Sequence, residues 1–166
     1  MRVVGIDPGL KGALVCLESH GPGKRPVVRV AEPVPLVGKQ YDVPGMRQLL
    51  AAAEPDCVYL EQVGAFHGAS SKSSFSFGMG FGLWLGLVAG LRLPLVLVTA
   101  PMWMRVMHAG IAPSESTKKR SELACGRLLP TLVLKPGKRR VSHDGLADAA
   151  LVALYGIRDR GHGNER

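Results

Sequence analysis

The sequence predicts an α/β fold in which a mixed sheet is flanked by helices within a single domain. Short β-branched runs come first and are joined by a turn containing proline and glycine, which is typical of a hairpin. Further along, apolar strands alternate with helical segments, which is typical of crossover connections in one sheet. The chain has 166 residues, 46% of them hydrophobic, enough for the core of one domain.

Three strands are expected near the N-terminus. Residues 2–6 form an apolar, β-rich run that ends at Asp7, directly before the turn. Residues 12–17 follow as the hairpin partner, and the β-branched residues 26–31 suit a third strand. Two prolines and a glycine in residues 32–42 predict a loop.

Helices and strands alternate in the rest of the chain. Residues 44–54 predict a helix, because its proline suits the first turn. Apolar strands are expected over residues 57–60, which lead to Glu61, and over residues 95–98. The remaining segments are a polar loop over 64–74, helices over 75–91, 101–108, 116–129 and 144–157, and a basic loop over 134–141. We expect one domain over residues 1–158 and a flexible tail over 159–166.

Composition narrows the class of protein. The net charge of +8 favours a polyanionic partner such as nucleic acid, with solubility alone as the alternative. The three cysteines are far apart and lack CxxC spacing, which predicts buried thiols and a reducing compartment. The most membrane-like stretch, residues 79–91, is shorter than the ~20 residues of a spanning helix. We therefore expect a cytoplasmic protein that does not enter a membrane.

Four carboxylates stand where they could act together. Asp7 and Glu61 each end an apolar strand, before a turn and before a polar loop. Asp144 and Asp148 are four residues apart, so a helix would carry them on one face. Small apolar neighbours surround Asp148, which predicts a packed environment where an unpaired charge is costly. The alternatives are a turn cap for Asp7, an ordinary strand-end acid for Glu61 and a solvated surface pair.

Convergence of these acids would favour metal chemistry. Crowded carboxylates raise the pKa of at least one of them, and Mg²⁺ relieves the repulsion because it prefers carboxylate oxygen. Two such ions can activate a water and stabilise the leaving oxygen of a phosphodiester. The pattern therefore predicts a metal-dependent nuclease as one hypothesis.

Three motifs in order resemble a known family. They are GIDPG at residues 5–9, LEQV at residues 60–63 and HDGLADA at residues 143–149. Together they resemble the RuvC-type Holliday-junction resolvases, above all the phage-type members, over residues 3–156. The resemblance implies a ribonuclease-H-like fold, a homodimer and two Mg²⁺ or Mn²⁺ ions per active site. It also implies paired symmetric nicks in four-way DNA junctions, in the nucleoid of a bacterial or phage-infected cell, during recombination and repair.

The resemblance also assigns site residues. Asp7, Glu61 and Asp148 match metal ligands of the family. Many relatives place the last two acids three residues apart, but here Gly145 occupies that position. Asp144 is therefore the favoured fourth ligand, and His143 is a second possibility whose alternative is a surface residue before the helix.

A second departure follows Glu61. Bacterial relatives carry an aromatic residue directly after the Glu-Gln-Val string, where this chain has Gly64. Phe66 could stack on junction bases instead, an interaction worth ~1–3 kcal/mol per base, or pack under its own loop.

Clusters of basic residues suit phosphate contacts, which position DNA without reading its sequence. A solvated surface is the alternative for each cluster. The expected DNA-binding residues are Lys72, Lys118, Lys119, Arg120, Lys135, Lys138, Arg139 and Arg140.

Glycines recur every four residues in the helix expected over 75–91, at Gly78, Gly82, Gly86 and Gly90. They would form one smooth stripe, and each costs up to ~1 kcal/mol against alanine. Either a second subunit packs on this stripe, or the helix packs tightly on its own sheet.

Four functions remain to be separated. The first is a junction resolvase, and the second is another ribonuclease-H-like nuclease acting on RNA, hybrids or flapped and branched DNA. The third is a non-catalytic nucleic-acid-binding module, which would have no use for four acids. The fourth is a sugar-kinase-like phosphotransferase, suggested by the first motif alone; such enzymes need two domains around a cleft.

Overall fold

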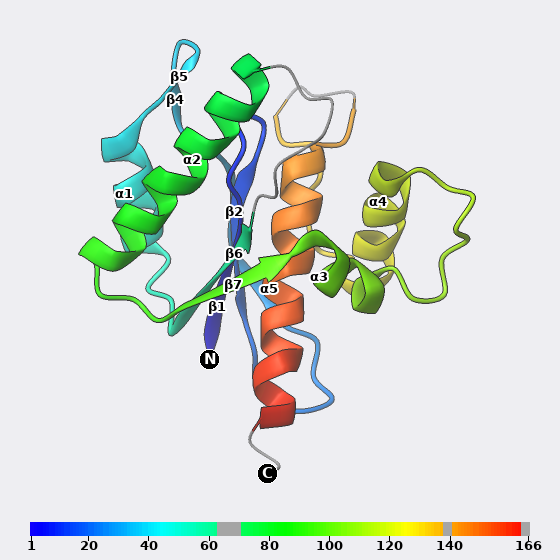
Figure 1. The fold of residues 1–166 in the computed structure, drawn as a ribbon. Helices are drawn as coiled ribbons and strands as arrows, with labels where there is room; N and C mark the ends of the chain where they lie inside the picture. The colour runs from blue at the N-terminus through cyan, green and yellow to red at the C-terminus, as the bar shows by residue number, and fades with distance from the viewer. Residues whose placement is uncertain (63–70, 138–140, 164–166) are drawn as a thin grey trace.

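The computed structural model describes residues 1–62, 71–137 and 141–163, with side chains except those of residues 71–73 and 162–163. Within these ranges a five-stranded mixed sheet has the order β3-β2-β1-β6-β7. Helices cover both faces of the sheet (Figure 1). The predicted fold class, a mixed sheet flanked by helices, is confirmed.

Strand β1 (Arg2–Asp7) lies at the centre of the sheet. It pairs antiparallel with β2 (Ala13–Glu18), which pairs in turn with β3 (Val27–Pro33). On its other side β1 runs parallel to β6 (Cys57–Gln62), and β6 runs parallel to β7 (Leu95–Thr99). This arrangement places the C-terminal ends of three parallel strands at one edge of the sheet.

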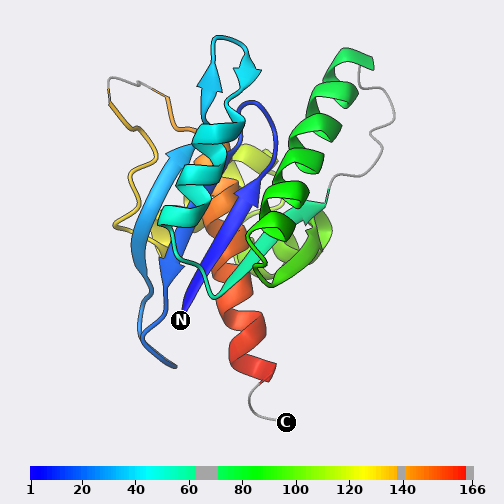
Figure 2. The same ribbon diagram turned by 90° about the vertical axis from the view of Figure 1, so that its left-hand side faces the viewer.

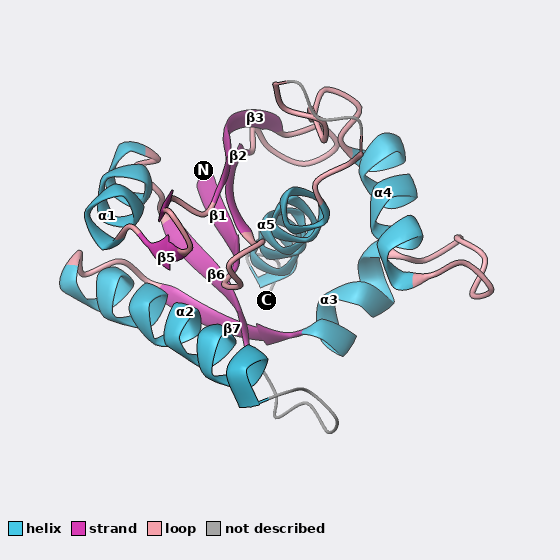
Figure 3. Cartoon of the chain, turned by 90° about the horizontal axis from the view of Figure 1, so that it is seen from above, coloured by secondary structure: helices cyan, strands magenta, loops and turns pink. Residues whose placement is uncertain are grey.

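Two helical layers enclose the sheet (Figures 2 and 3). One contains α1 (Val43–Ala52) and α2 (Ser71–Gly90). The other contains α3 (Ala100–Met107), α4 (Thr117–Leu128) and α5 (Asp144–Gly163). Each layer has its own buried core, because alternate strand residues point to opposite faces.

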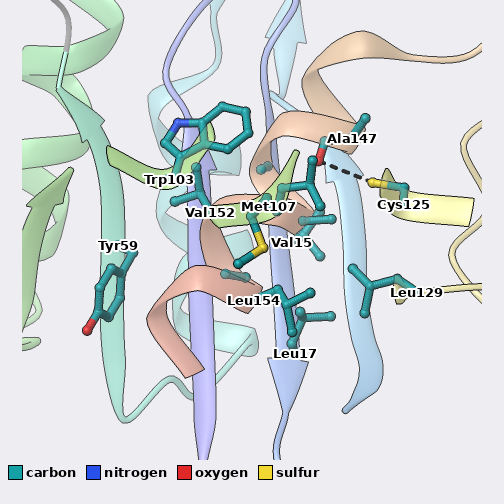
Figure 4. Close-up of a cluster of buried hydrophobic side chains, with 14 of the residues drawn as sticks. Val15, Leu17, Tyr59, Trp103, Met107, Cys125, Leu129, Ala147, Val152 and Leu154 are labelled. Atoms are coloured by element: carbon teal, nitrogen blue, oxygen red, sulfur yellow. Dashed lines mark hydrogen bonds between the residues drawn. The ribbon is translucent and has the colours of Figure 1, made fainter. Parts of the chain in front are cut away.

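Helix α5 packs closely on the sheet, and Figure 4 shows part of the core between them. A Cβ on Gly5 would lie 2.2 Å from the carbonyl oxygen of Ala149, and a Cβ on Gly156 would lie 2.5 Å from the Tyr59 ring. Both glycines therefore let α5 rest directly on the central strands. All three cysteines are buried free thiols, as predicted.

Two expected boundaries were wrong. The segment expected as a loop over residues 32–42 contains a short hairpin of β4 (Leu36–Val37) and β5 (Gln40–Tyr41), which turns at Gly38 with φ +62°. Helix α2 begins at Ser71, before the expected start at residue 75.

The C-terminal helix is also longer than expected. It continues to Gly163, beyond the expected end at residue 157. The Tyr59 hydroxyl donates a hydrogen bond to Asp159 Oδ2 at 2.8 Å, which ties this part of α5 to the sheet. Along the described ranges, no helix is long and apolar enough to cross a membrane.

The glycine stripe of α2 does not pack on the sheet. A Cβ at Gly78, Gly82, Gly86 or Gly90 would meet no described atom within 4 Å outside its own helix. The interpretation that the stripe packs on its own sheet is therefore wrong. Gly80 is the glycine of α2 that makes a close approach, against Pro8 and Tyr41.

Candidate metal and nucleic-acid site

The ends of two parallel strands bring Asp7 and Glu61 to the same edge of the sheet. In the register of β1 and β6, Ile6 pairs with Leu60, so the two acids come next in line. Both acids stand at alternate positions from Gly5 and Tyr59, which face α5. The acids therefore lie on the face of the sheet that α5 covers.

Asp7 is largely withdrawn from water. Its pKa is raised from the ordinary 3.8 to about 6, chiefly by burial and to a smaller extent by the charges of Asp148 and Asp144. The backbone N–H of Gly9, which donates to Asp7 Oδ1 at 3.3 Å, acts in the opposite direction. The pKa of Asp7 thus depends on the charges of both acids of α5, Asp144 and Asp148.

Glu61 is held by an aromatic side chain. The indole Nε1 of Trp103 donates a hydrogen bond to Glu61 Oε1 at 3.1 Å. The pKa of Glu61 is raised to about 7: burial is the main cause, the charges of Asp7 and Asp148 act in the same direction, and the Trp103 hydrogen bond acts against them.

Asp148 completes a group of three coupled carboxylates. Its pKa is raised to about 6: burial is the main cause, the Ser121 hydroxyl acts against it, and the Asp144 charge raises the pKa further toward that value. Within the described part of the chain, Asp148 Oδ1 is buried and has no hydrogen-bond partner. Such an atom is costly unless a further ligand satisfies it.

Asp144 lies at the exposed border of this group. Its carboxylate forms an ion pair with Lys118 Nζ at 2.7 Å, with both side chains largely open to solvent. Asp144 therefore contributes its charge to the site from the solvent side, and Lys118 neutralises part of it.

His143 is buried, so its interpretation as a surface residue before the helix was wrong. Its Nδ1 accepts a hydrogen bond from the backbone N–H of Leu146 at 3.2 Å, which caps the start of α5. Coordination of a metal by His143 would therefore have to use Nε2.

The donor chemistry of the site fits a hard divalent cation. Among the described residues, no three histidine, cysteine, aspartate or glutamate side chains are close enough to bind one ion together. Mg²⁺ does not require such a cage, because it is usually bound by one or two carboxylates together with waters and substrate phosphates. The coupled carboxylates and the unsatisfied Oδ1 of Asp148 meet that requirement.

A cavity of about 400 Å³ opens beside Asp7. The turn after β1 forms one wall, including Lys11, and Phe77 of α2 forms part of another. Lys11 is exposed and was not selected from the sequence, because a single lysine in a turn carries no distinguishing pattern. Trp103 and Ser121 were also not selected, because a single tryptophan or serine within a helix carries no distinguishing sequence pattern.

The basic residues expected to bind DNA are only partly gathered around the site. Lys118, Lys119 and Arg120 occupy the first turns of α4, where Lys119 also pairs with Glu122 at 3.0 Å. The exposed Lys135 lies in the loop before α5, and Lys72 lies at the start of α2, with its side chain not described. Phe66, Lys138, Arg139 and Arg140 lie outside the described residues.

Comparisons with solved structures identify the fold. Thermus thermophilus RuvC superposes with a TM-score of 0.72 at 23% identity, covering 98% of this chain and 97% of that one. RuvC of T. thermophilus in complex with Holliday junction substrate gives 0.71 at 19% identity, with 98% and 96% covered. The fowlpox virus resolvase, in complex with Holliday junction DNA, gives 0.57 at 14% identity, covering 96% of this chain and 99% of that one.

The yeast mitochondrial Holliday junction resolvase Ydc2 gives a TM-score of 0.56 at 18% identity, covering 94% of this chain and 77% of that one. Neither a protein-family model nor a curated protein matches the sequence. The structural likeness nevertheless spans nearly the whole chain and agrees with the three sequence motifs. The chain therefore has the ribonuclease-H-like fold of the RuvC-type Holliday junction resolvases.

Proposed function

We propose that this protein is a divalent-metal-dependent endonuclease that resolves four-way DNA junctions by paired symmetric nicks. The observation that carries the proposal is the electrostatic interaction of Asp148 on α5 with Asp7 and Glu61 on the sheet, where each of the three carboxylates has a raised pKa. The RuvC-like fold supports the choice of a junction as substrate.

The three carboxylates would hold Mg²⁺ or Mn²⁺, two ions per active site, with Asp144 as the favoured fourth ligand and His143 as the second possibility. Bound ions supply a nucleophilic water at neutral pH and neutralise charge on the leaving oxygen. The protein contributes fixed carboxylate orientation, since Trp103 ties one oxygen of Glu61 and Gly9 ties one oxygen of Asp7.

Basic residues would position the DNA backbone over these acids. Lys118 is within salt-bridge distance of Asp144, and Lys11 lines the cavity beside Asp7, so both lie at the border of the site. Electrostatic contacts of this kind give affinity without sequence selectivity. Lys119, Arg120, Lys135, Lys72 and the basic segment 138–140 would extend the contact surface, and Phe66 would stack on a junction base.

Symmetric paired nicks require two active sites, and we propose that a homodimer supplies them. The outer surface of α2 is suited to this role. Phe75 is 72% exposed and Met79 is 42% exposed. They adjoin the glycine stripe, where an added Cβ would meet no described atom within 4 Å outside its own helix. Exposed apolar area of this kind marks an interaction surface, and the glycines permit close approach of a second backbone.

The test is cleavage of a labelled four-way junction, compared with a linear duplex, a flap and an RNA–DNA hybrid. Each substrate is incubated with Mg²⁺, Mn²⁺ or EDTA. Symmetric nicks in the junction alone, lost in EDTA, are expected. Broad cutting of flaps or hybrids would favour a general ribonuclease-H-like nuclease, and binding without cutting in either metal would refute catalysis.

The acids are tested with Asp7→Asn and Asp148→Asn in the same assay. Both variants should bind the junction but fail to cut it, because the amide cannot replace a metal-binding carboxylate. Glu115→Gln is the matched control, since Glu115 is an exposed acid in the loop before α4. Cleavage by Asp148→Asn at the rate of this control would remove Asp148 from the site.

A further inference from the structure

The core beneath α5 contains polar side chains in an apolar setting. Three polar or charged residues are buried in the described part of the chain: His108, Ser121 and His143. His143 caps α5, which accounts for its burial. His108 and Ser121 do not cap a helix with their side chains. Burial of their polar groups costs free energy unless each finds a hydrogen-bond partner.

Trp103 shows a directed contact with the site. It is fully buried, and its indole N–H donates to Glu61 at 3.1 Å. Trp84, the other tryptophan, is equally buried on the opposite side of the sheet, but its Nε1 has no hydrogen-bond partner among the described residues. Burial of an indole in this protein therefore does not by itself require a bonded N–H, and the Trp103 bond is specific to the carboxylate.

His108 and Ser121 reach the other carboxylate from the same core. His108 Nε2 lies 3.1 Å from Ser121 Oγ. The Ser121 hydroxyl faces Asp148 and lowers the pKa of that carboxyl, as a nearby hydrogen-bond donor does. One helical turn after Ser121, Cys125 Sγ donates to the Ala147 carbonyl oxygen at 3.5 Å, which shows that this face of α4 meets α5 beside Asp148 (Figure 4).

The proton count fixes the roles within this pair. A serine hydroxyl has one proton, and when that proton goes to Asp148 the oxygen must accept from His108. His108 is then the neutral tautomer with its proton on Nε2. This assignment agrees with the observation that His108 Nδ1 has no partner among the described residues.

The two contacts are joined through the aromatic rings. The Trp103 and His108 rings meet edge to face, with centroids 5.5 Å apart and an interplanar angle of 82°. One continuous buried group of Trp103, His108 and Ser121 therefore runs from a hydrogen bond with Glu61 to the neighbourhood of Asp148. All three residues of this group are buried, so a role in contacting DNA is excluded.

We propose that Trp103, His108 and Ser121 are positioning residues, which hold the Glu61 and Asp148 carboxylates in the orientation that binds the metal ions. The proposal rests on the proposed function for the identity of the site. Each contact ties one side of a carboxylate from within the core and restricts its rotation. Outer-shell partners of this kind typically change metal affinity or activity by about 10- to 100-fold when removed.

The primary measurement is Mn²⁺ affinity by calorimetry without DNA, beside single-turnover junction cleavage over a range of Mn²⁺ concentrations. Trp103→Phe keeps an aromatic ring but removes the N–H, and Trp84→Phe is its matched control. Ser121→Ala removes the hydroxyl, and Cys125→Ala is its control because it deletes a buried atom one turn away at the same helix contact. The first variant of each pair should bind Mn²⁺ about 10- to 100-fold more weakly than its control.

A second pair of variants separates positioning from packing. His108→Gln retains a side-chain N–H that can donate to Ser121, whereas His108→Leu does not. We expect His108→Gln to keep Mn²⁺ affinity near that of the wild type and His108→Leu to lose it. Cleavage by the weakened variants should recover at high Mn²⁺, because the defect is in occupancy of the site.

The outcomes distinguish this inference from the proposed function. Wild-type protein that binds Mn²⁺ but cuts no junction would refute the function, while the shifts in Mn²⁺ affinity would still support the positioning role. Wild-type protein that binds and cuts, with all variants equal to their controls, would overturn the positioning role alone. Absence of Mn²⁺ binding by the wild type would overturn both.

Discussion

Replacement of Asp7 by asparagine should make the metal-free protein more stable at high pH. The folded structure raises the pKa of Asp7 from the ordinary 3.8 to about 6, chiefly by burial. A raised pKa means that the protonated carboxyl group favours the fold. That contribution is fully present below about pH 4 and is lost as pH rises through about 6.

The size of the effect follows from the same shift. A pKa that moves from 3.8 to about 6 corresponds to about 3 kcal/mol of stability lost on ionisation. The neutral amide of Asp7→Asn avoids this cost while preserving the shape of the side chain. We expect the variant to exceed the wild type by about 2–3 kcal/mol at pH 8 in EDTA, and by much less at pH 4.5.

Urea denaturation at both pH values, with Glu115→Gln as the control, measures this difference. Mg²⁺ at pH 8 should then stabilise the wild type and leave Asp7→Asn almost unchanged, because only the folded wild type offers the carboxylate. Equal stability of the two proteins at pH 8 in EDTA would show that Asp7 is not held in the desolvated, like-charged setting described above.

Three further predictions follow from the packing and charge of the same structure. Gly5→Ala should lower the free energy of unfolding, measured in urea, by about 1–3 kcal/mol, because the new Cβ would fall 2.2 Å from the backbone of α5. Its control is Gly126→Ala, at an open helical position, which should raise the free energy of unfolding by up to ~1 kcal/mol. Lys118→Ala should weaken junction binding and lower the slope of log affinity against log salt by about 1, measured by filter binding, whereas an unchanged slope would remove Lys118 from the interface. Met79→Arg should convert a dimer to a monomer in light scattering after gel filtration, while Leu123→Arg, an equally exposed position on α4, should remain dimeric.

Much of the fold was predictable because the sequence pattern is local. Alternating apolar residues indicated the strands, and prolines and glycines marked most of their ends. The hairpin of β4 and β5 was missed because it rests on two pairings alone, Leu36 with Tyr41 and Val37 with Gln40, which are too short to leave a hydrophobic pattern. The end of α5 was misplaced because a contact between Tyr59 and Asp159, far apart in the chain, extends it.

The position of the acids was predictable for a different reason. Asp7 and Glu61 end apolar strands, and Asp144 and Asp148 share one helix face by their spacing, so each is placed by local geometry. The prediction that a raised pKa would result from their crowding agrees with the pKa values of Asp7, Glu61 and Asp148. The burial of His143 was not predictable, because it depends on tertiary packing, whereas its cap on the Leu146 N–H joins residues only three apart.

The sequence by itself determined the strands of the main sheet, the existence of the helices and the positions of the four acids, because each depends on neighbours a few residues away. Only the tertiary structure decided how these parts meet. The close packing of α5 on β1 at Gly5 brings the charge of Asp148 near Asp7 and Glu61. The packing of α3 places Trp103 beside Glu61, and the packing of α4 places Ser121 beside Asp148. Those contacts join residues distant in the chain, and they arise from burial of apolar surface on both faces of the sheet, which no local pattern encodes.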